Sequence, residues 1–230
     1  ALPLAYVPDP QSPITDTLGD GRIVDTVRFP RTTLAWQGGD CDDTTALLCS
    51  LLESQGLGTA ILTSPGHVFL AFDTGEAPDS AWLFAAPGYE TIVAAGKLWI
   101  PLESTNLGEG FAGAWKLASG LVARYRGTRD LAVLPLAALR KTYPALPLPP
   151  SGLPLPRPDA AQRASLAALT MARFAKEVSG PVLAGLDRGR QGGTGLEWER
   201  ASNKMARAQA WYGQGAAAMA TLAALVEKSP

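Results

Sequence analysis

Residues 38–48 read Gly-Gly-Asp-Cys-Asp-Asp-Thr-Thr-Ala-Leu-Leu, and they mark the start of a helix. Apolar residues recur at helical spacing after this stretch, and Gly56 is a residue type that commonly follows a helix end. Asp40 is placed to cap the first turn, because its short polar side chain can accept a hydrogen bond from a free backbone N–H group there. The stretch therefore predicts a helix over residues 42–55, with Cys41 at its N-terminal end.

Extended segments follow this predicted helix. Three of them contain alternating or continuous apolar residues and lie between turn-forming residues. They are Thr59–Leu62, His67–Phe72 and Lys97–Leu102. Two shorter segments, Trp82–Phe84 and Tyr89–Val93, are further candidate strands. A helix followed by strands of antiparallel appearance is typical of the α+β class, so we expect an α+β fold.

An irregular lead-in and three further elements complete the predicted first part of the chain. Residues 1–30 are rich in Pro, Asp, Thr and Gly and predict an irregular lead-in. The later pattern predicts a helix at 111–125, a strand at 131–134 and a short helix at 136–141. We expect residues 1–143 to form one domain.

A proline-rich segment separates this domain from a helical tail. Seven of the fifteen residues from Pro144 to Pro158 are proline, which excludes a continuous helix or strand ladder, so we interpret residues 144–158 as a linker. The Ala- and Leu-rich remainder, 159–230, predicts an all-α appendage. Its expected elements are one long helix from Asp159 to about Leu186 with a break at Gly180-Pro181, a glycine-rich end at 189–195, and a helix pair at 196–212 and 216–228.

Composition excludes several classes of partner. Lys and Arg together number 20 and Asp and Glu 21, with no dense basic run, so the chain lacks the charge pattern of a nucleic-acid-binding protein. No apolar stretch reaches the roughly 18 residues that span a bilayer, so we expect no transmembrane segment.

Cys41 and Cys49 would lie about 12 Å apart along one helix, which is too far for a disulfide.

The residues that can carry chemistry are Cys41, His67 and Glu103. A thiol attacks carbonyl groups as the thiolate and usually needs an imidazole as proton acceptor. The positive end of the helix dipole favours a charged sulfur at Cys41, while Asp42 and Asp43 oppose it unless their carboxylates are tied down. His67 is the one histidine in the chain and begins a strand. If the strand that ends near Glu103 is its neighbour, this carboxylate can hold the imidazole in one tautomer.

Three blocks of sequence resemble the motifs of the transglutaminase-like superfamily, a branch of the papain-like cysteine enzymes. They are the run at 38–48, Pro-Gly-His-Val-Phe at 65–69 and Trp-Ile-Pro-Leu-Glu at 99–103, and the likeness covers roughly residues 28–107. The resemblance implies a papain-like core, with the Cys helix packed on an antiparallel sheet that carries His and Glu. It also implies that Cys41 is the nucleophile, His67 the base and Glu103 the residue that orients the base, although the family more commonly has Asp at this third position.

The resemblance further implies cysteine-dependent acyl transfer on amide substrates through a thioester, as a protease, amidase or transglutaminase-like enzyme. The expected partner is a protein or peptide substrate, and no cofactor is expected. The lead-in at 29–34 is similar to that of bacterial members attached to helical repeats, which suggests a periplasmic or exported protein. The tail faintly resembles a tetratricopeptide unit around Tyr212-Gly213-Gln214-Gly215 and could contact a protein partner.

Three alternatives stay open at this point. The oxyanion formed during acyl transfer needs donors, for which we consider the backbone N–H of Cys41 together with Gln37 or Trp36. Carboxylates favour hard cations, so Asp40, Asp42 and Asp43 could instead bind calcium, although helix capping explains the same residues. Finally, the chain could be a weak or inactive member of the fold that acts as a protein-binding scaffold.

Overall fold

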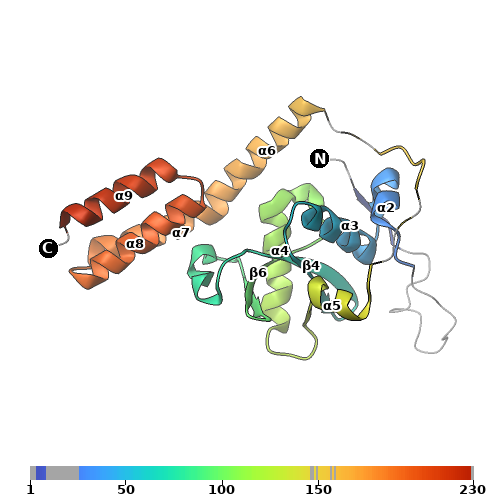
Figure 1. The fold of residues 1–230 in the computed structure, drawn as a ribbon, viewed down its shortest axis with the longest axis horizontal. Coiled ribbons are helices and arrows are strands. Elements are labelled where there is room, and N and C mark those ends of the chain that lie inside the picture. Colours follow the sequence, from blue (N-terminus) through green and yellow to red (C-terminus); the bar gives the residue numbers. More distant parts are fainter. Residues whose placement is uncertain are drawn as a thin grey trace. The chain divides into compact units, whose positions relative to one another are not determined.

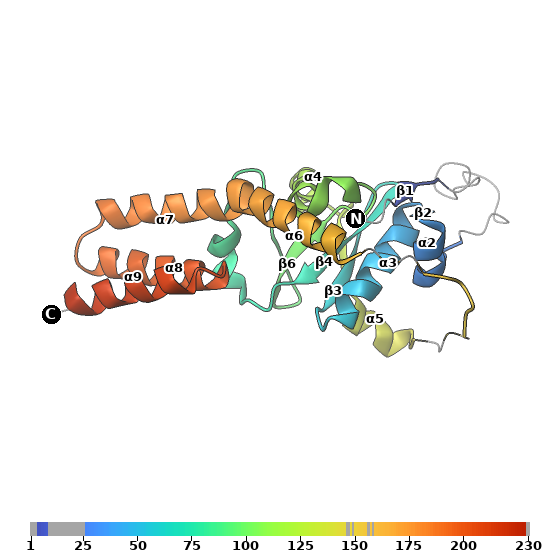
Figure 2. The same ribbon diagram turned by 90° about the horizontal axis from the view of Figure 1, so that it is seen from above.

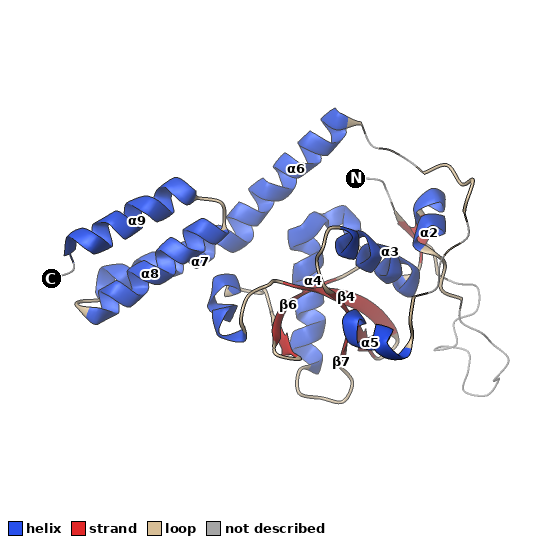
Figure 3. Cartoon of the chain, viewed as in Figure 1, coloured by secondary structure: helices blue, strands red, loops and turns tan. Residues whose placement is uncertain are grey.

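The computed structural model describes residues 4–8, 26–145, 148, 150–155, 157 and 159–228. It divides into two compact units, one of Ala1–Ser80 with Gly88–Thr170 and one of Ala81–Pro87 with Met171–Pro230. The first unit has the α+β architecture expected from the sequence, and the second is built from helices (Figure 3). The division falls inside a helix rather than at the proline-rich segment, and residues 81–87 lie with the helical unit.

A curled five-stranded antiparallel sheet forms the centre of the first unit. Its strands are β3 (Thr59–Ser64), β4 (His67–Asp73), β5 (Ile92–Ala94), β6 (Lys97–Leu102) and β7 (Ala132–Pro135), in the order β5-β6-β4-β3-β7. This confirms the three main predicted strands and the strand predicted at 131–134. The prediction of a strand at Trp82–Phe84 was wrong, because these residues end a 3-10 helix, Pro78–Phe84. In the segment predicted at Tyr89–Val93, the strand begins only at Ile92.

Helix α3 (Cys41–Ser54) packs against β4 and β3 (Figure 1). The Asp40 side chain accepts a hydrogen bond from the Asp43 backbone N–H at 3.4 Å, which confirms the predicted N-cap. Gly56 follows the helix with φ at +82°, a conformation that glycine adopts without steric cost. These local signals explain why the helix begins at Cys41 and ends before the turn into β3.

A second helix, α4 (Gly110–Tyr125), packs against strand β6 of the sheet. Apolar side chains of the sheet and of α4 form one buried cluster: Ala60, Leu62, Phe69, Ala71, Ile92, Trp99, Ala118 and Val122. Burial of this much apolar surface is the main stabilising contribution to such a domain. A short helix, α5 (Leu136–Thr142), follows β7.

The N-terminal lead-in contains a strand that the sequence did not predict. Strand β1 (Ala5–Tyr6) pairs in parallel with β2 (Gly38–Gly39), through hydrogen bonds from Ala5 N to Gln37 O at 2.8 Å and from Val7 N to Gly39 O at 3.0 Å. Helix α2 (Pro30–Trp36) precedes β2. The residues between 8 and 26 lie outside the described part of the chain.

Helix α6 (Ala160–Phe174) runs across the division into the helical unit. The long helices that follow it in this unit are α7 (Gly180–Gly192), α8 (Leu196–Trp211) and α9 (Gly215–Lys228). Helix α8 packs against both α7 and α9 (Figure 2). The break predicted at Gly180-Pro181 takes the form of a π-helical turn at Ala175–Ser179. Proline cannot donate to the helix ladder, and a Cβ atom at Gly180 would lie 2.8 Å from the Ala175 carbonyl oxygen.

Helix α7 also runs further than predicted, through glycines that each cost only about 1 kcal/mol. Residues 81–87 belong to this unit through Leu83 and Phe84. The Tyr212 hydroxyl donates a hydrogen bond to the Leu83 carbonyl, and the Phe84 ring meets the Trp211 ring edge-on at 4.9 Å. Among the described residues, no helix combines the length and apolar character needed to cross a membrane.

The glycine before the Asp40 cap offers a direct test of how α3 begins. A Cβ atom at Gly39 would lie 2.6 Å from the Asp43 Cβ, so we expect Gly39→Ala to lower the free energy of unfolding by about 1–3 kcal/mol. Gly120→Ala is the matched control, because Gly120 lies in α4 with open space around it and should gain about 0.5–1 kcal/mol. Urea unfolding of both variants measures the difference, and equal stabilities would contradict this packing.

Candidate active site

Cys41 is the first residue of α3 and lies directly after the β2 segment and the Asp40 cap. It is partly exposed, whereas Cys49 on the same helix is buried, and both thiols are free, as the spacing predicted. Burial raises the pKa of the Cys49 thiol to about 11, which keeps it in the unreactive protonated form at neutral pH. The two cysteines therefore differ in access to solvent, and only Cys41 begins a helix.

His67 and Glu103 meet across the pairing of β4 with β6. His67 Nε2 lies 2.8 Å from Glu103 Oε2, which confirms the expectation that neighbouring strands bring these residues together. In this pairing Leu70 is opposite Leu102, the last residue of β6, and Glu103 follows Leu102 directly. His67 begins β4 three residues before Leu70, so His67 and Glu103 lie at the same end of the paired strands.

The Glu103 carboxylate is fixed on its other side by Thr105. Glu103 Oε1 accepts hydrogen bonds from the Thr105 backbone N–H at 2.9 Å and from the Thr105 hydroxyl at 2.7 Å. Burial raises the pKa of Glu103, but the hydrogen bonds from His67 and Thr105 outweigh it and hold this pKa below its usual range. The carboxylate is therefore ionised at neutral pH and held in one orientation.

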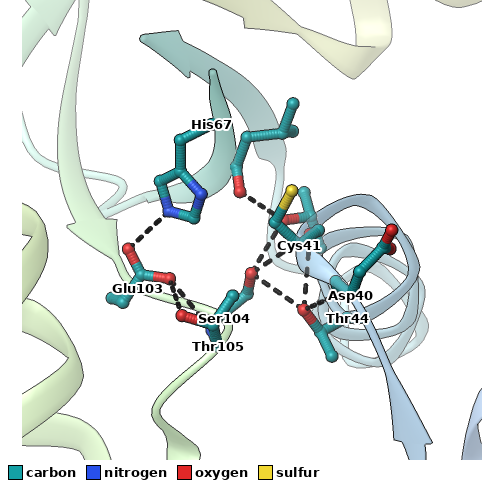
Figure 4. A network of polar contacts seen from close by, with 9 residues as sticks. Asp40, Cys41, Thr44, His67, Glu103, Ser104 and Thr105 are labelled. Carbon is teal, nitrogen blue, oxygen red and sulfur yellow. Dashed lines mark hydrogen bonds and ion pairs between the residues drawn. The ribbon is translucent and has the colours of Figure 1, made fainter. Parts of the chain in front are cut away.

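The imidazole of His67 lies between Cys41 and Glu103 (Figure 4). Its Nε2 is bonded to Glu103, which leaves Nδ1 for the side of Cys41. The pKa of His67 is raised to about 9, first by its hydrogen bond with the Cys41 side chain and then by its hydrogen bond with Glu103, against the effect of burial. His67 is therefore protonated at neutral pH, and its ring stacks on Phe69 with centroids 5.8 Å apart.

The acidic residues beside Cys41 are largely engaged by other groups. Asp43 is buried, accepts a hydrogen bond from the Arg28 backbone N–H at 2.6 Å and pairs with the Arg28 guanidinium. Asp40 caps the helix. Because the Asp43 carboxylate is tied to Arg28, its charge does not oppose a thiolate at Cys41.

The same acidic residues also have the geometry to bind a cation. Ligand oxygens of Asp40, Asp42 and Asp43 can all lie within 4.8 Å of one another. The Arg28 guanidinium already neutralises Asp43, which weakens the case for a calcium ion there. The calcium alternative stays a prediction.

The structure gives Gln37 and Trp36 other contacts. Gln37 adopts a left-handed conformation with φ at 55°, caps the end of α2 through its backbone N–H, and pairs with β1 through its carbonyl oxygen. The exposed Trp36 ring lies under the Arg28 guanidinium at 5.7 Å. Their role as oxyanion donors stays a prediction, while the Cys41 N–H lies in the first turn of α3, where backbone donors are free.

Sequence reasoning missed the polar residues that surround the three candidates. Thr44, Thr45 and Ser104 form a buried cluster of hydroxyls, Thr105 holds Glu103, and Arg28 pairs with Asp43. One signal was present in the sequence. Two adjacent threonines occur in the first turns of a helix whose later inward positions, Leu47 and Cys49, are apolar, and a serine and a threonine follow Glu103 directly.

Comparisons of the chain with family models, with curated proteins and with solved structures gave no match. The likeness to the transglutaminase-like superfamily therefore remains an interpretation of three motif blocks. The case for an active site depends on the geometry of Cys41, His67 and Glu103.

The single histidine makes the charge of this site directly measurable. Its two carbon-bound ring protons give the histidine signals in the proton NMR spectrum, and we expect these signals to titrate near pH 9. Glu103→Gln removes a negative charge beside the imidazolium and should lower the pKa, and Cys41→Ala should lower it as well. Glu90→Gln, which removes a carboxylate paired with Arg126, is the control and should leave it unchanged. Titration near 6.5 in the unmodified protein would contradict the arrangement.

Proposed function

We propose that this protein is a cysteine-dependent enzyme that transfers acyl groups from amide substrates through a thioester on Cys41. The observation that carries the proposal is the position of the His67 imidazole, which is hydrogen-bonded to Glu103 at 2.8 Å and faces Cys41 on its other side (Figure 4). A thiol, an imidazole and an orienting carboxylate are the groups that nucleophilic acyl transfer needs. The motif likeness supports the same assignment.

In the first half of the proposed reaction, the Cys41 thiolate attacks the carbonyl carbon of a glutamine side chain or peptide bond. The negative charge that develops on the carbonyl oxygen needs N–H donors, and the backbone N–H of Cys41 is the first candidate. The imidazolium of His67 gives its proton to the leaving nitrogen as the C–N bond breaks. Ammonia or an amine departs, and Cys41 carries the acyl group as a thioester.

In the second half, water or a primary amine attacks the thioester carbon. Neutral His67 accepts the proton of this nucleophile, and the Cys41 sulfur leaves as the thiolate. Water gives a carboxylic acid, and an amine gives a new amide. Glu103 stabilises the imidazolium in both halves and does not itself transfer a proton.

The exposure of the three residues fits this division of roles. Cys41 is partly exposed and the His67 side chain is 24% exposed, whereas the Glu103 side chain is 8% exposed. The groups that would meet a substrate therefore reach solvent. The group that would orient the base is shielded from water, where its hydrogen bonds are stronger.

Alkylation rates test the proposal, because the chain contains its own reference thiol. We expect iodoacetamide at pH 7 to modify Cys41 on the order of 100-fold faster than buried Cys49. His67→Ala should slow the reaction of Cys41 at pH 7 by on the order of tenfold or more, because the imidazolium that stabilises the thiolate is gone. Mass spectrometry with fragment-ion assignment follows both sites, which lie in one tryptic peptide.

Exposure alone would also make Cys41 faster than Cys49, so the effect of His67→Ala and the pH profile decide the question. A Cys41 rate that is unchanged in His67→Ala at every pH would contradict the proposal. That outcome would favour the second candidate, a protein-binding module that keeps the fold without turnover.

A further inference from the structure

A buried cluster of three hydroxyls contacts the backbone around each residue of the candidate active site. The Ser104 hydroxyl lies 3.3 Å from the Cys41 carbonyl oxygen, and Ser104 directly follows Glu103 in the chain. The Thr45 hydroxyl lies 3.4 Å from the carbonyl oxygen of Val68, the residue after His67. The cluster therefore reaches α3, β4 and the end of β6 at once.

The hydroxyls also contact one another. Ser104 Oγ lies 3.0 Å from Thr44 Oγ1 and 2.9 Å from Thr45 Oγ1, and all three residues are at most 2% exposed. Thr44 in turn contacts the Asp40 carbonyl oxygen at 2.7 Å. Each hydroxyl has one hydrogen to donate and can accept as well, so the cluster satisfies its buried polar groups through mutual contacts.

The placement of these hydroxyls is informative because apolar side chains of similar size could fill the same space. Burial of a hydroxyl is unfavourable unless hydrogen bonds compensate for the lost water, so such a cluster adds little net stability. Hydrogen bonds are directional, however, whereas the contacts of Leu47 and other apolar residues of α3 are not. The cluster therefore fixes how the first turn of α3 is oriented against the ends of β4 and β6.

We propose that Ser104, together with Thr44 and Thr45, is a positioning residue that holds Cys41 at the correct distance and angle from the His67–Glu103 pair. Thr105 already fixes Glu103, and the pairing of β4 with β6 fixes His67 relative to Glu103. Cys41 lies on a different element, and Ser104 bridges that element to β6. This inference rests on the proposed function, because positioning matters only if Cys41 and His67 act together.

Ser104→Ala tests the inference, with Ser119→Ala as the matched control. Ser119 is similarly buried, and its hydroxyl makes hydrogen bonds to the Trp115 carbonyl oxygen and from the Glu90 N–H, but it lies in α4 and outside the hydroxyl cluster. We expect Ser104→Ala to slow the alkylation of Cys41 at pH 7 about tenfold and to shift the titration of His67 from about 9 toward 6.5. Ser119→Ala should change neither measurement, although both variants should lower Tm.

A second pair of variants covers the case in which Ser104→Ala does not fold. Thr45→Val removes the hydroxyl and keeps the shape of the side chain, so it should reproduce the loss of alkylation rate. Thr45→Ser keeps a hydroxyl at this position, so it should retain most of the alkylation rate of the unmodified protein. Variants of Thr45 and Ser104 that behave like Ser119→Ala would overturn the positioning role alone. If Cys41 of the unmodified protein reacts as an ordinary thiol and His67 titrates near 6.5, the proposed function and the positioning role fail together.

Discussion

The pairing of β4 with β6 is the constraint on which the candidate active site depends. This antiparallel register brings the start of β4 beside the end of β6, where His67 Nε2 and Glu103 Oε2 lie 2.8 Å apart. A shift by one residue would turn one of the two side chains to the opposite face of the sheet.

The charges around Cys41 are arranged so that a thiolate can exist beside several carboxylates. Asp43 pairs with Arg28 and Asp40 accepts from the first turn of α3, while Glu103 is directed to the far side of His67. The imidazole of His67 then stands between Cys41 and the Glu103 carboxylate (Figure 4). The pKa of His67 is raised by its hydrogen bonds with the Cys41 side chain and with Glu103, which outweigh the effect of burial.

The main elements of the fold and the three site candidates could be predicted because each has a strong local signal. The Asp40 cap and the apolar spacing after it predicted α3, and the one histidine left a single candidate base. Ser104 and Thr45 could not be predicted in the same way. The adjacent threonines and the serine after Glu103 mark them as unusual, but the contact itself joins residues 59 positions apart in the chain, and a local pattern does not show such a contact.

The wrong prediction at Trp82–Phe84 has a similar cause. Aromatic and apolar residues favour strands, but here Phe84 packs against Trp211 and the Leu83 carbonyl accepts from Tyr212, so the helical unit determines their conformation. Strand β1 was missed because its two residues carry almost no pattern. It depends on the close approach of Gly38, where a Cβ atom would lie 3.1 Å from Val7 Cγ2.

The acyl-enzyme is the species that most directly tests the central claim that Cys41, His67 and Glu103 form one nucleophilic centre. Intact-protein mass spectrometry after brief exposure to p-nitrophenyl acetate should detect one acetyl group, assigned to Cys41 by fragment ions and lost again over time in water. His67→Ala should form this adduct much more slowly. Acetylation confined to surface lysines, or equal acetylation of Cys41 with and without His67, would contradict the account.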